Sequence, residues 1–280
     1  MSADGQLKPI ITAHLFPQLE RMLVELLFSL TPCEWEKQTL APKWKVKDVA
    51  AHLLDTELRR LSLCRDGYAS ELPKISSPED LVAFVNGLNQ EGVTTFRRLS
   101  PRVLTELVGQ VSSELCEYFA SLDPLAQAQW GVSWAGEERS ANWFDVAREF
   151  TERWHHQQQI RAAVDKPGIM TRELYYPVLD CFMRALPFRY RNLQRAPRAV
   201  ARFTIRGECG GTWHLLRGGE GWELVDAYAG AIASETSIPQ EIAWRVFTKG
   251  IAPEEARAQT QISGDVELGA HVLGMISIVG

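Results

Sequence analysis

Hydrophobic residues recur at three- and four-residue steps through the first part of the chain, which predicts a series of amphipathic helices. The expected helices cover residues 8–30, 45–65, 78–99, 101–122 and 142–161. Thr31-Pro32 ends the first of them, and Ser100-Pro101 separates the third from the fourth. Long helices with short connections predict an N-terminal up-and-down four-helix bundle.

The pattern changes after Asp165-Lys166-Pro167-Gly168, which ends the helical series. A further helix is expected from Thr171 to Leu186. Beyond Pro197 the period becomes two, which predicts strands over residues 199–206, 212–216, 222–225 and 258–263, a helix from Pro239 to Gly250 and a last helix capped by Asp265. The sequence therefore predicts a multi-domain protein with a helical bundle at 1–165, a bridging helix and connection at 166–197, and a small α+β domain at 198–280.

Composition narrows the class of protein. The chain has 280 residues and a net charge of −5, so nothing favours a nucleic-acid partner. No apolar run reaches membrane-spanning length and no secretory signal is recognised, so we expect neither a membrane partner nor export. The five cysteines lie scattered along the chain, which is typical of free thiols in a reducing compartment. A cytoplasmic protein is expected.

The helix expected at 142–161 carries the main candidate chemistry. Glu152 and His156 lie four residues apart, so both side chains leave the same face of the helix. His52, near the middle of the second helix, is the candidate third ligand, because helical bundles bind metals between facing helices. Two histidines and one carboxylate with an open position suit a catalytic divalent metal, zinc first and nickel as the alternative.

Other interpretations of the same residues stay open. His155 lies three residues after Glu152, so spacing alone does not distinguish it from His156. Glu149 is a competing carboxylate, although two turns separate it from His156. The simplest alternative to a metal is a surface Glu152–His156 pair and a partly buried His52.

Arginine is concentrated at the expected junction of the two domains. Seven arginines and no acidic residue lie between Cys181 and Gly207. Arginine forks bind carboxylates and phosphates in a bidentate manner, so this run could hold an anionic ligand. Arg184, Arg189 and Arg191 are the arginines expected to face the bundle. The alternative is a solvated basic surface.

Two stretches carry a family resemblance. Trp44-Lys-Val-Lys-Asp-Val-Ala-Ala-His52 and Glu152-Arg-Trp-His-His156 resemble the metal-binding domain of mycothiol-dependent maleylpyruvate isomerases, part of the wider DinB-like superfamily. The resemblance implies a four-helix bundle whose His, Glu and His ligands fall on His52, Glu152 and His156. The tail, from Gly210-Gly-Thr-Trp to Ile262-Ser-Gly-Asp265, resembles the sterol-carrier-protein-like domain that follows the bundle in this family.

The chain departs from the family at two positions. Gln159 stands where the family often has an aspartate that could support the second histidine, and Gly250-Ile251 stands where relatives tend to have Gly-Arg.

The resemblance implies an enzyme that uses a metal and a low-molecular-weight thiol such as mycothiol, acting as an isomerase or S-transferase on a small anionic molecule, with a homodimer as an option. It assigns no catalytic residue beyond the metal ligands. The alternatives are a non-enzymatic small-ligand-binding or stress-response protein with a structural metal, and a metal-dependent hydrolase using metal-activated water.

Overall fold

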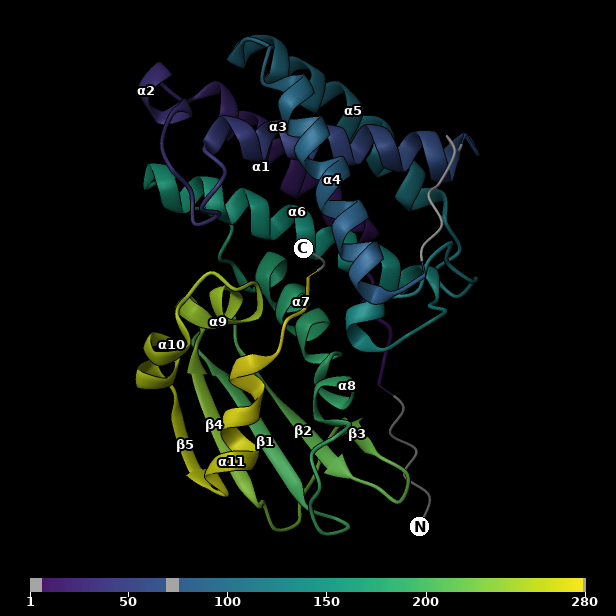
Figure 1. Cartoon of the computed structure of the whole chain (residues 1–280), viewed down its shortest axis with the longest axis vertical. Helices are drawn as coiled ribbons and strands as arrows, with labels where there is room; N and C mark the ends of the chain where they lie inside the picture. The colour runs from purple at the N-terminus through teal and green to yellow at the C-terminus, as the bar shows by residue number, and fades with distance from the viewer. Residues whose placement is uncertain (1–6, 69–75, 279–280) are drawn as a thin grey trace.

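The computed structural model describes residues 7–68 and 76–278. Figure 1 shows a helical region formed by the N-terminal part of the chain and, beside it, a sheet with the helices that cover it. Helix α6 lies on the side of the helical region that faces the sheet, and α7 runs from there toward the strands. Within the described residues, no helix is both long and apolar enough to cross a membrane.

The helical region contains most of the expected elements. Its helices are α1 (Phe16–Phe28), α2 (Pro32–Trp35), α3 (Val46–Arg60), α4 (Pro78–Phe96), α5 (Pro101–Ser121) and α6 (Asn142–Val164), with short turns η1 (Ala13–Leu15), η2 (Leu61–Arg65) and η3 (Ser133–Ala135). Helix α3 packs against α4, α5 and α6, and α1 packs against α5 and α6. The first helix begins later than the predicted residue 8, because Pro17 lacks a backbone N–H and is accommodated in the first turn.

Side-chain caps define several helix starts. Ser77, Ser100, Thr171 and Asp265 each accept a hydrogen bond from the backbone N–H three residues later. Asn142, whose residue type is a common helix cap, is instead the first residue of α6. Ala141 occupies the cap position, and the Asn142 amide instead donates to the carbonyl of Asp123.

The expected bridging helix is divided in two. Helix α7 (Arg172–Met183) and helix α8 (Leu186–Tyr190) replace the single predicted helix from Thr171 to Leu186. Pro187 lies in the first turn of α8, where a missing N–H is tolerated.

The C-terminal part is a mixed five-stranded sheet in the order β3-β2-β1-β4-β5. The strands are β1 (Val200–Arg206), β2 (Gly211–Arg217), β3 (Trp222–Val225), β4 (Ser234–Pro239) and β5 (Gln261–Gly264). Strand β1 pairs in parallel with β4, and the other pairs are antiparallel. The helices of this part are α9 (Gln240–Phe247), α10 (Pro253–Gln259), α11 (Val266–Ala270) and the turn η4 (His271–Gly274).

Two expectations for this part need correction. Strand β4 was not predicted, because its buried positions include Ser234 and Thr236 and so lack a hydrophobic alternation. The strand predicted at 258–263 is partly helical. Helix α10 ends at Gln259, and only the residues from Gln261 onward pair with β4.

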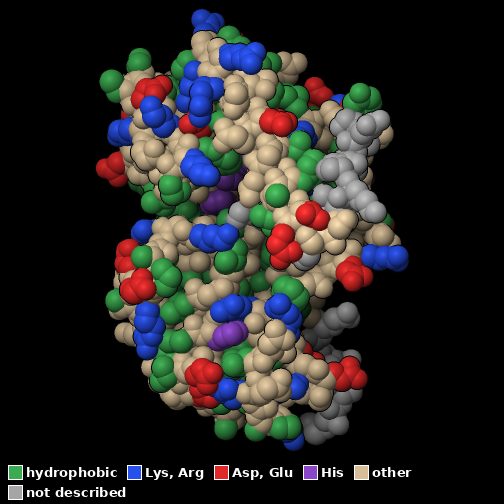
Figure 2. Space-filling model, in the orientation of Figure 1, with side chains coloured by type: hydrophobic (Ala, Val, Ile, Leu, Met, Phe, Trp, Pro, Cys, Tyr) green, Lys and Arg blue, Asp and Glu red, His purple; other side chains and the backbone are tan. Residues whose placement is uncertain are grey.

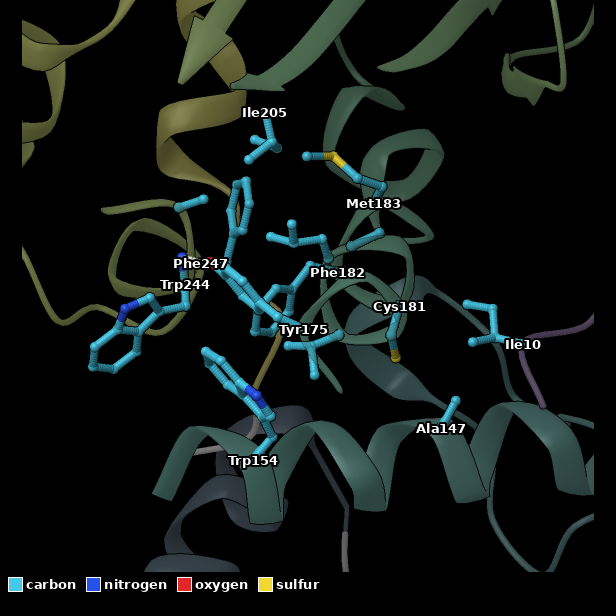
Figure 3. Packing of buried hydrophobic residues seen from close by; sticks show 14 of the residues in the cluster. Ile10, Ala147, Trp154, Tyr175, Cys181, Phe182, Met183, Ile205, Trp244 and Phe247 are labelled. Atoms are coloured by element: carbon cyan, nitrogen blue, oxygen red, sulfur yellow. Dashed lines mark hydrogen bonds between the residues drawn. The ribbon is translucent and has the colours of Figure 1, made fainter. Parts of the chain in front are cut away.

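A continuous hydrophobic cluster joins the helices to the sheet. Trp154 of α6 stacks on Tyr175 of α7, with ring centroids 4.4 Å apart and an interplanar angle of 2°. The Trp154 indole N–H donates to the carbonyl of Ile169, and the Tyr175 hydroxyl donates to the carbonyl of Gln240. Figure 3 shows Trp154 pointing from α6 toward Tyr175 and Phe247. The side of α6 that carries Trp154 is therefore packed in the hydrophobic core.

Candidate metal centre

The side of α6 turned toward α3 carries the predicted ligands. His52 of α3 and His156 of α6 are both buried, and their ring centroids lie 4.7 Å apart. The Glu152 Oε2 atom is 3.7 Å from Nε2 of His156. The ring of Trp44 lies against His52, at 4.6 Å between centroids. The structure therefore brings the three predicted residues together under an aromatic side chain.

His155 is a fourth candidate at the same place. Its Nδ1 atom also lies 3.7 Å from Oε2 of Glu152. Donor atoms of Glu152, His155 and His156 all fall within 4.8 Å of one another, a spacing that a metal ion could bridge. The ambiguity between His155 and His156 that sequence spacing leaves open thus persists in the distances.

Burial favours the neutral form of the three histidines and of Glu152. Desolvation lowers the pKa of His155 and of His156 to about 3, and it lowers the pKa of His52 well below its usual value. Desolvation also raises the pKa of Glu152, which His156 partly opposes. The Nδ1 atom of His52 has no hydrogen-bond partner among the described residues. Neutral imidazoles with an unpaired ring nitrogen beside a carboxyl group offer nitrogen and oxygen donors that can bind a divalent cation.

Gln159 contacts both histidines of α6. Its Oε1 atom lies 3.0 Å from Nδ1 of His156, and its Nε2 atom lies 3.0 Å from Nε2 of His155. The carboxylate that the family often has at this position is missing, but the amide oxygen contacts the same ring. Sequence spacing could have identified Gln159 as a support for His156, but its contact with His155 depends on side-chain rotamers.

The competing carboxylate, Glu149, is engaged elsewhere. It pairs with Arg60 and with Arg148, each at 2.8 Å. Asp145, one turn earlier, accepts from the same two arginines. These ion pairs keep the Glu149 carboxylate with the guanidinium groups and leave Glu152 as the carboxylate beside the imidazoles.

A cavity of about 1640 Å³ opens onto the histidine cluster. Its walls come from α3, α4, α6, the loops 40–44 and 130–138, and the segment 248–250 of the C-terminal part. Figure 2 shows histidine side chains in a hollow between the two parts of the molecule, with Lys and Arg side chains nearby. The charged side chains that line it are Lys43, Arg59, Arg60, Arg148, Arg153 and Lys249, together with Glu137, Glu138, Glu149 and Glu152. Cations thus outnumber acids around the cavity.

The arginines predicted to hold an anion lie in other surroundings. None of Arg184, Arg189 and Arg191 is among the described residues that line this cavity. Arg184 donates to the carbonyl of Lys8 and to Asp180, Arg189 donates to the carbonyl of His271, and Arg191 donates to the carbonyl of Phe188. The cavity instead brings together cations from α3, α6 and the 40–44 and 248–250 segments, which sequence composition did not single out.

A buried charge network behind the cavity was also missed. Arg153 of α6 binds Glu20 of α1 and Glu57 of α3, and all three side chains are almost completely buried. Ser112 of α5 lies 2.5 Å from Oε1 of Glu57. Glu20 sits in the apolar stripe of the first helix, and a charged residue at such a position is a sequence signal for a buried partner.

The comparisons with known proteins agree with this combination of helices, sheet and histidine site. Residues 16–161, more than half of the chain, match the family described as mycothiol maleylpyruvate isomerase N-terminal domain. The chain therefore belongs to this family. No curated protein matches it in sequence.

Two solved structures are similar to the chain. A histidine-to-alanine mutant of the mycothiol-dependent maleylpyruvate isomerase superposes with a TM-score of 0.54, covering 93% of this chain and 98% of its own, at 11% identity. Another structure of that isomerase covers 86% of this chain and 91% of its own, at 12% identity and a TM-score of 0.47. At this identity the first likeness establishes a common fold, from the helices through the sheet.

Proposed function

We propose that His52, Glu152 and His156 bind one divalent metal, zinc first and nickel as the alternative, in an enzyme that uses a low-molecular-weight thiol such as mycothiol. The reaction would be an isomerisation or an S-transfer on a small anionic molecule. The observation that carries the proposal is the buried group of neutral imidazoles beside Glu152, open to a large cavity. Membership of the mycothiol maleylpyruvate isomerase family favours the thiol.

The residues would divide the work as follows. Bound by two neutral histidines and one carboxylate, the metal would keep a thiol sulfur deprotonated at neutral pH, which supplies a strong nucleophile. Trp44 shields His52 from water on one side. Lys43 and Lys249 at the cavity wall would orient an anionic substrate and lower the energy of negative charge that develops on it.

A metal-binding assay tests the proposal. We expect the purified protein to contain close to one divalent ion per chain, and to regain it after stripping and reloading. His52→Ala and His156→Ala should each lose most of this metal, because each removes one of three protein ligands. Retention of wild-type metal content by both variants would refute the site. A titration of the metal-loaded protein with mycothiol then tests the thiol.

One observation favours a second candidate function. His155 lies as close to Glu152 as His156 does. If His155 also bound the ion, four protein ligands would close the coordination sphere, as in structural zinc sites. The protein would then be a non-enzymatic ligand-binding or stress-response protein. Metal-dependent hydrolysis is the alternative if the open position holds water.

The finer assignments of fold and assembly belong to the same proposal. We infer a DinB-like four-helix bundle at 1–165, a bridging segment at 166–197 and a sterol-carrier-protein-like domain at 198–280, in a cytoplasmic protein with a homodimer as an option. The packing of α1, α3, α5 and α6 supports the bundle. The five-stranded sheet with its covering helices supports the second domain.

A further inference from the structure

The side-chain amide of Gln159 forms a bridge between two consecutive histidines of α6. Its oxygen lies 3.0 Å from His156 Nδ1 and its nitrogen 3.0 Å from His155 Nε2. Gln159 and both imidazoles are buried at the wall of the cavity. An amide oxygen only accepts and an amide NH₂ only donates, which fixes the position of the proton on each neutral ring.

The bridge gives the two rings opposite roles at Glu152. His156 donates through Nδ1 to the amide oxygen, so its Nε2 lone pair faces Glu152. His155 accepts at Nε2 from the amide NH₂, so its Nδ1 carries a proton on the side of Glu152. A nitrogen that carries a proton cannot bind a metal, although both nitrogens lie 3.7 Å from the same carboxylate oxygen.

We propose that Gln159 is a positioning residue that selects His156 over His155 as a metal ligand and so leaves one coordination position for an exogenous ligand. This inference rests on the proposed metal site. The distances alone allow four residues to bind the metal, whereas the bridge limits the protein ligands to three. The other ring, His155, turns its Nδ1–H toward Glu152 at 3.7 Å, which is too far for a hydrogen bond.

Reversal of the amide would exchange the two roles. With its nitrogen at His156 and its oxygen at His155, Gln159 would present the His155 lone pair and the His156 N–H to Glu152. The position of His52 decides between the two arrangements, because its ring lies 4.7 Å from that of His156. The orientation described here is the one in which the lone pair of His156, the ring next to His52, faces Glu152, so that all three residues can share one metal.

A carboxylate in place of the amide would remove the selection. The Gln159→Glu side chain has the same length but only accepts, so it would take an N–H from Nδ1 of His156 and from Nε2 of His155. Both rings would then present a lone pair toward Glu152. The variant should bind the metal through four protein ligands, and it should bind an added thiol more weakly than the wild type does.

The tautomers can be measured on the metal-free wild-type protein by long-range ¹H–¹⁵N correlation of the histidine rings. We expect both His155 and His156 to carry the proton on Nδ1, with assignments from His155→Gln and His156→Gln. A proton on Nε2 of either ring would overturn the bridge. This measurement needs no bound metal, so its outcome is independent of whether the proposed function holds.

Cobalt(II)-loaded protein tests the choice of ligand. X-ray absorption should count two histidines per cobalt in the wild type and three in Gln159→Glu, with a matching change in the visible spectrum. His155→Gln should leave cobalt affinity within about threefold, whereas His156→Gln should lose at least about 100-fold. Three histidines in the wild type, or equal losses in the two histidine variants, would contradict the proposal.

Gln159→Met serves as the matched variant without any hydrogen bond. It keeps the length and volume of the side chain, and we expect cobalt affinity to fall about 10–100-fold, as for other groups that orient a metal ligand. A higher cobalt affinity in Gln159→Glu than in Gln159→Met would show that the hydrogen bonds of this side chain, and not its packing, support metal binding. Unchanged affinity in Gln159→Met would show that the ligand is selected without the bridge. Circular dichroism and thermal unfolding check that each variant is folded.

Discussion

Arg153 holds two buried carboxyl groups with one positive charge. Glu20 and Glu57 both contact its guanidinium group, and these side chains are buried between α1, α3 and α6. Two ionised carboxylates would leave a net negative charge in a buried site, which is strongly unfavourable. Desolvation, with the Glu20 charge adding to it, raises the pKa of Glu57 to about 8, although Arg153 opposes the shift. The network therefore keeps a proton on Glu57 at neutral pH.

This protonation predicts how stability depends on pH. Because the pKa of Glu57 is higher in the folded chain than in the unfolded chain, the folded state binds more protons between about pH 4.5 and pH 8. The contribution of Glu57 is fully present below about pH 4.5 and is lost as pH rises toward 8, with a slope of up to about 1.4 kcal/mol per pH unit. Glu57→Gln should remove this slope.

The measurement is urea unfolding of metal-free protein at several pH values, compared between wild type and Glu57→Gln. Taking the difference cancels the titration of the buried histidines, which the two proteins share. Ser112→Ala is a useful control, because it removes a neutral partner of Glu57 without removing an ionisable group. If the difference between wild type and Glu57→Gln stays constant from pH 5 to 8, Glu57 does not retain its proton.

Lys249 tests where an anionic ligand binds. It lines the cavity, and its backbone φ of 59° is in the left-handed region that non-glycine residues rarely adopt. Lys249→Met keeps the aliphatic stem and removes the charge. Because the side chain is exposed, we expect affinity for a small dicarboxylate to fall a few-fold, by about 1 kcal/mol or less, with a smaller effect at high salt.

Arg184, Arg189 and Arg191 provide the contrasting set. If the sequence prediction of their role holds, alanine at one of them should cost about 2–5 kcal/mol of dicarboxylate affinity when the charge pair is buried. Their positions outside the cavity lining favour little change. Measured across a salt series, a large loss at any of the three together with no effect at Lys249 would place the anion near the arginine run.

At the level of elements, one face of α6 packs in the core and another face carries the candidate ligands. Trp154 holds one face against Tyr175, while Glu152 and His156 occupy the face toward α3 and the cavity. The Tyr175 hydroxyl fastens α9 to this assembly, since it donates to the carbonyl of Gln240 and accepts from the backbone N–H of Trp244. The orientation of the candidate ligands thus depends on packing behind the helix.

Tyr175→Phe tests whether the hydroxyl of Tyr175 contributes to stability without affecting metal binding. We expect the free energy of unfolding to fall by about 1–3 kcal/mol, because buried backbone groups lose a partner. The ring stack with Trp154 remains, so metal affinity should not change. Tyr118→Phe, whose half-exposed hydroxyl makes no hydrogen bond to another described residue, is the matched control. Equal unfolding free energies for the two variants would show that the hydroxyl contributes nothing.

At the scale of the whole molecule, the helices and the sheet share one hydrophobic cluster through α6, α7 and α9. The proposed domain boundary at 166–197 therefore divides the sequence, but the hydrophobic core continues across it. The segment between α8 and β1 is nonetheless accessible, since Arg191 and Arg198 are exposed, and so are Pro167 and Gly168. These exposed connections are where a folded chain is expected to be cut first.

Limited proteolysis tests this domain plan. Trypsin should cut first within 187–198, and a protease of broad specificity should also cut at 166–170. The fragments should stay associated after cleavage, because the shared cluster is large and apolar. Gel filtration of the nicked protein measures this association. A first cut inside 145–160 would contradict the plan, since that helix is buried on most of its surface.

Local patterns in the sequence determined much of what the structure contains. Helical periodicity predicted α3, α5 and α6, because one apolar face per helix is enough to reveal each of them. Alternation and glycine turns predicted β1 to β3, and the i, i+4 spacing put Glu152 and His156 on one face. Strand β4 escaped detection, because the inward serine and threonine of a central strand carry no hydrophobic signal.

Only the tertiary structure decided which polar groups meet. The pairing of Arg153 with Glu20 and Glu57 joins residues from three helices, and the cavity joins α3 and α6 to the segment 248–250. The approach of His52 to His156 depends on how α3 crosses α6, and the double contact of Gln159 depends on rotamers within a packed interior. The sequence alone identified Glu152 and His156 as candidate ligands, because their spacing is local, and it identified His52 through its place in the second helix and the family resemblance. Their partners and their protonation followed from packing between elements distant in the chain, which local patterns do not encode.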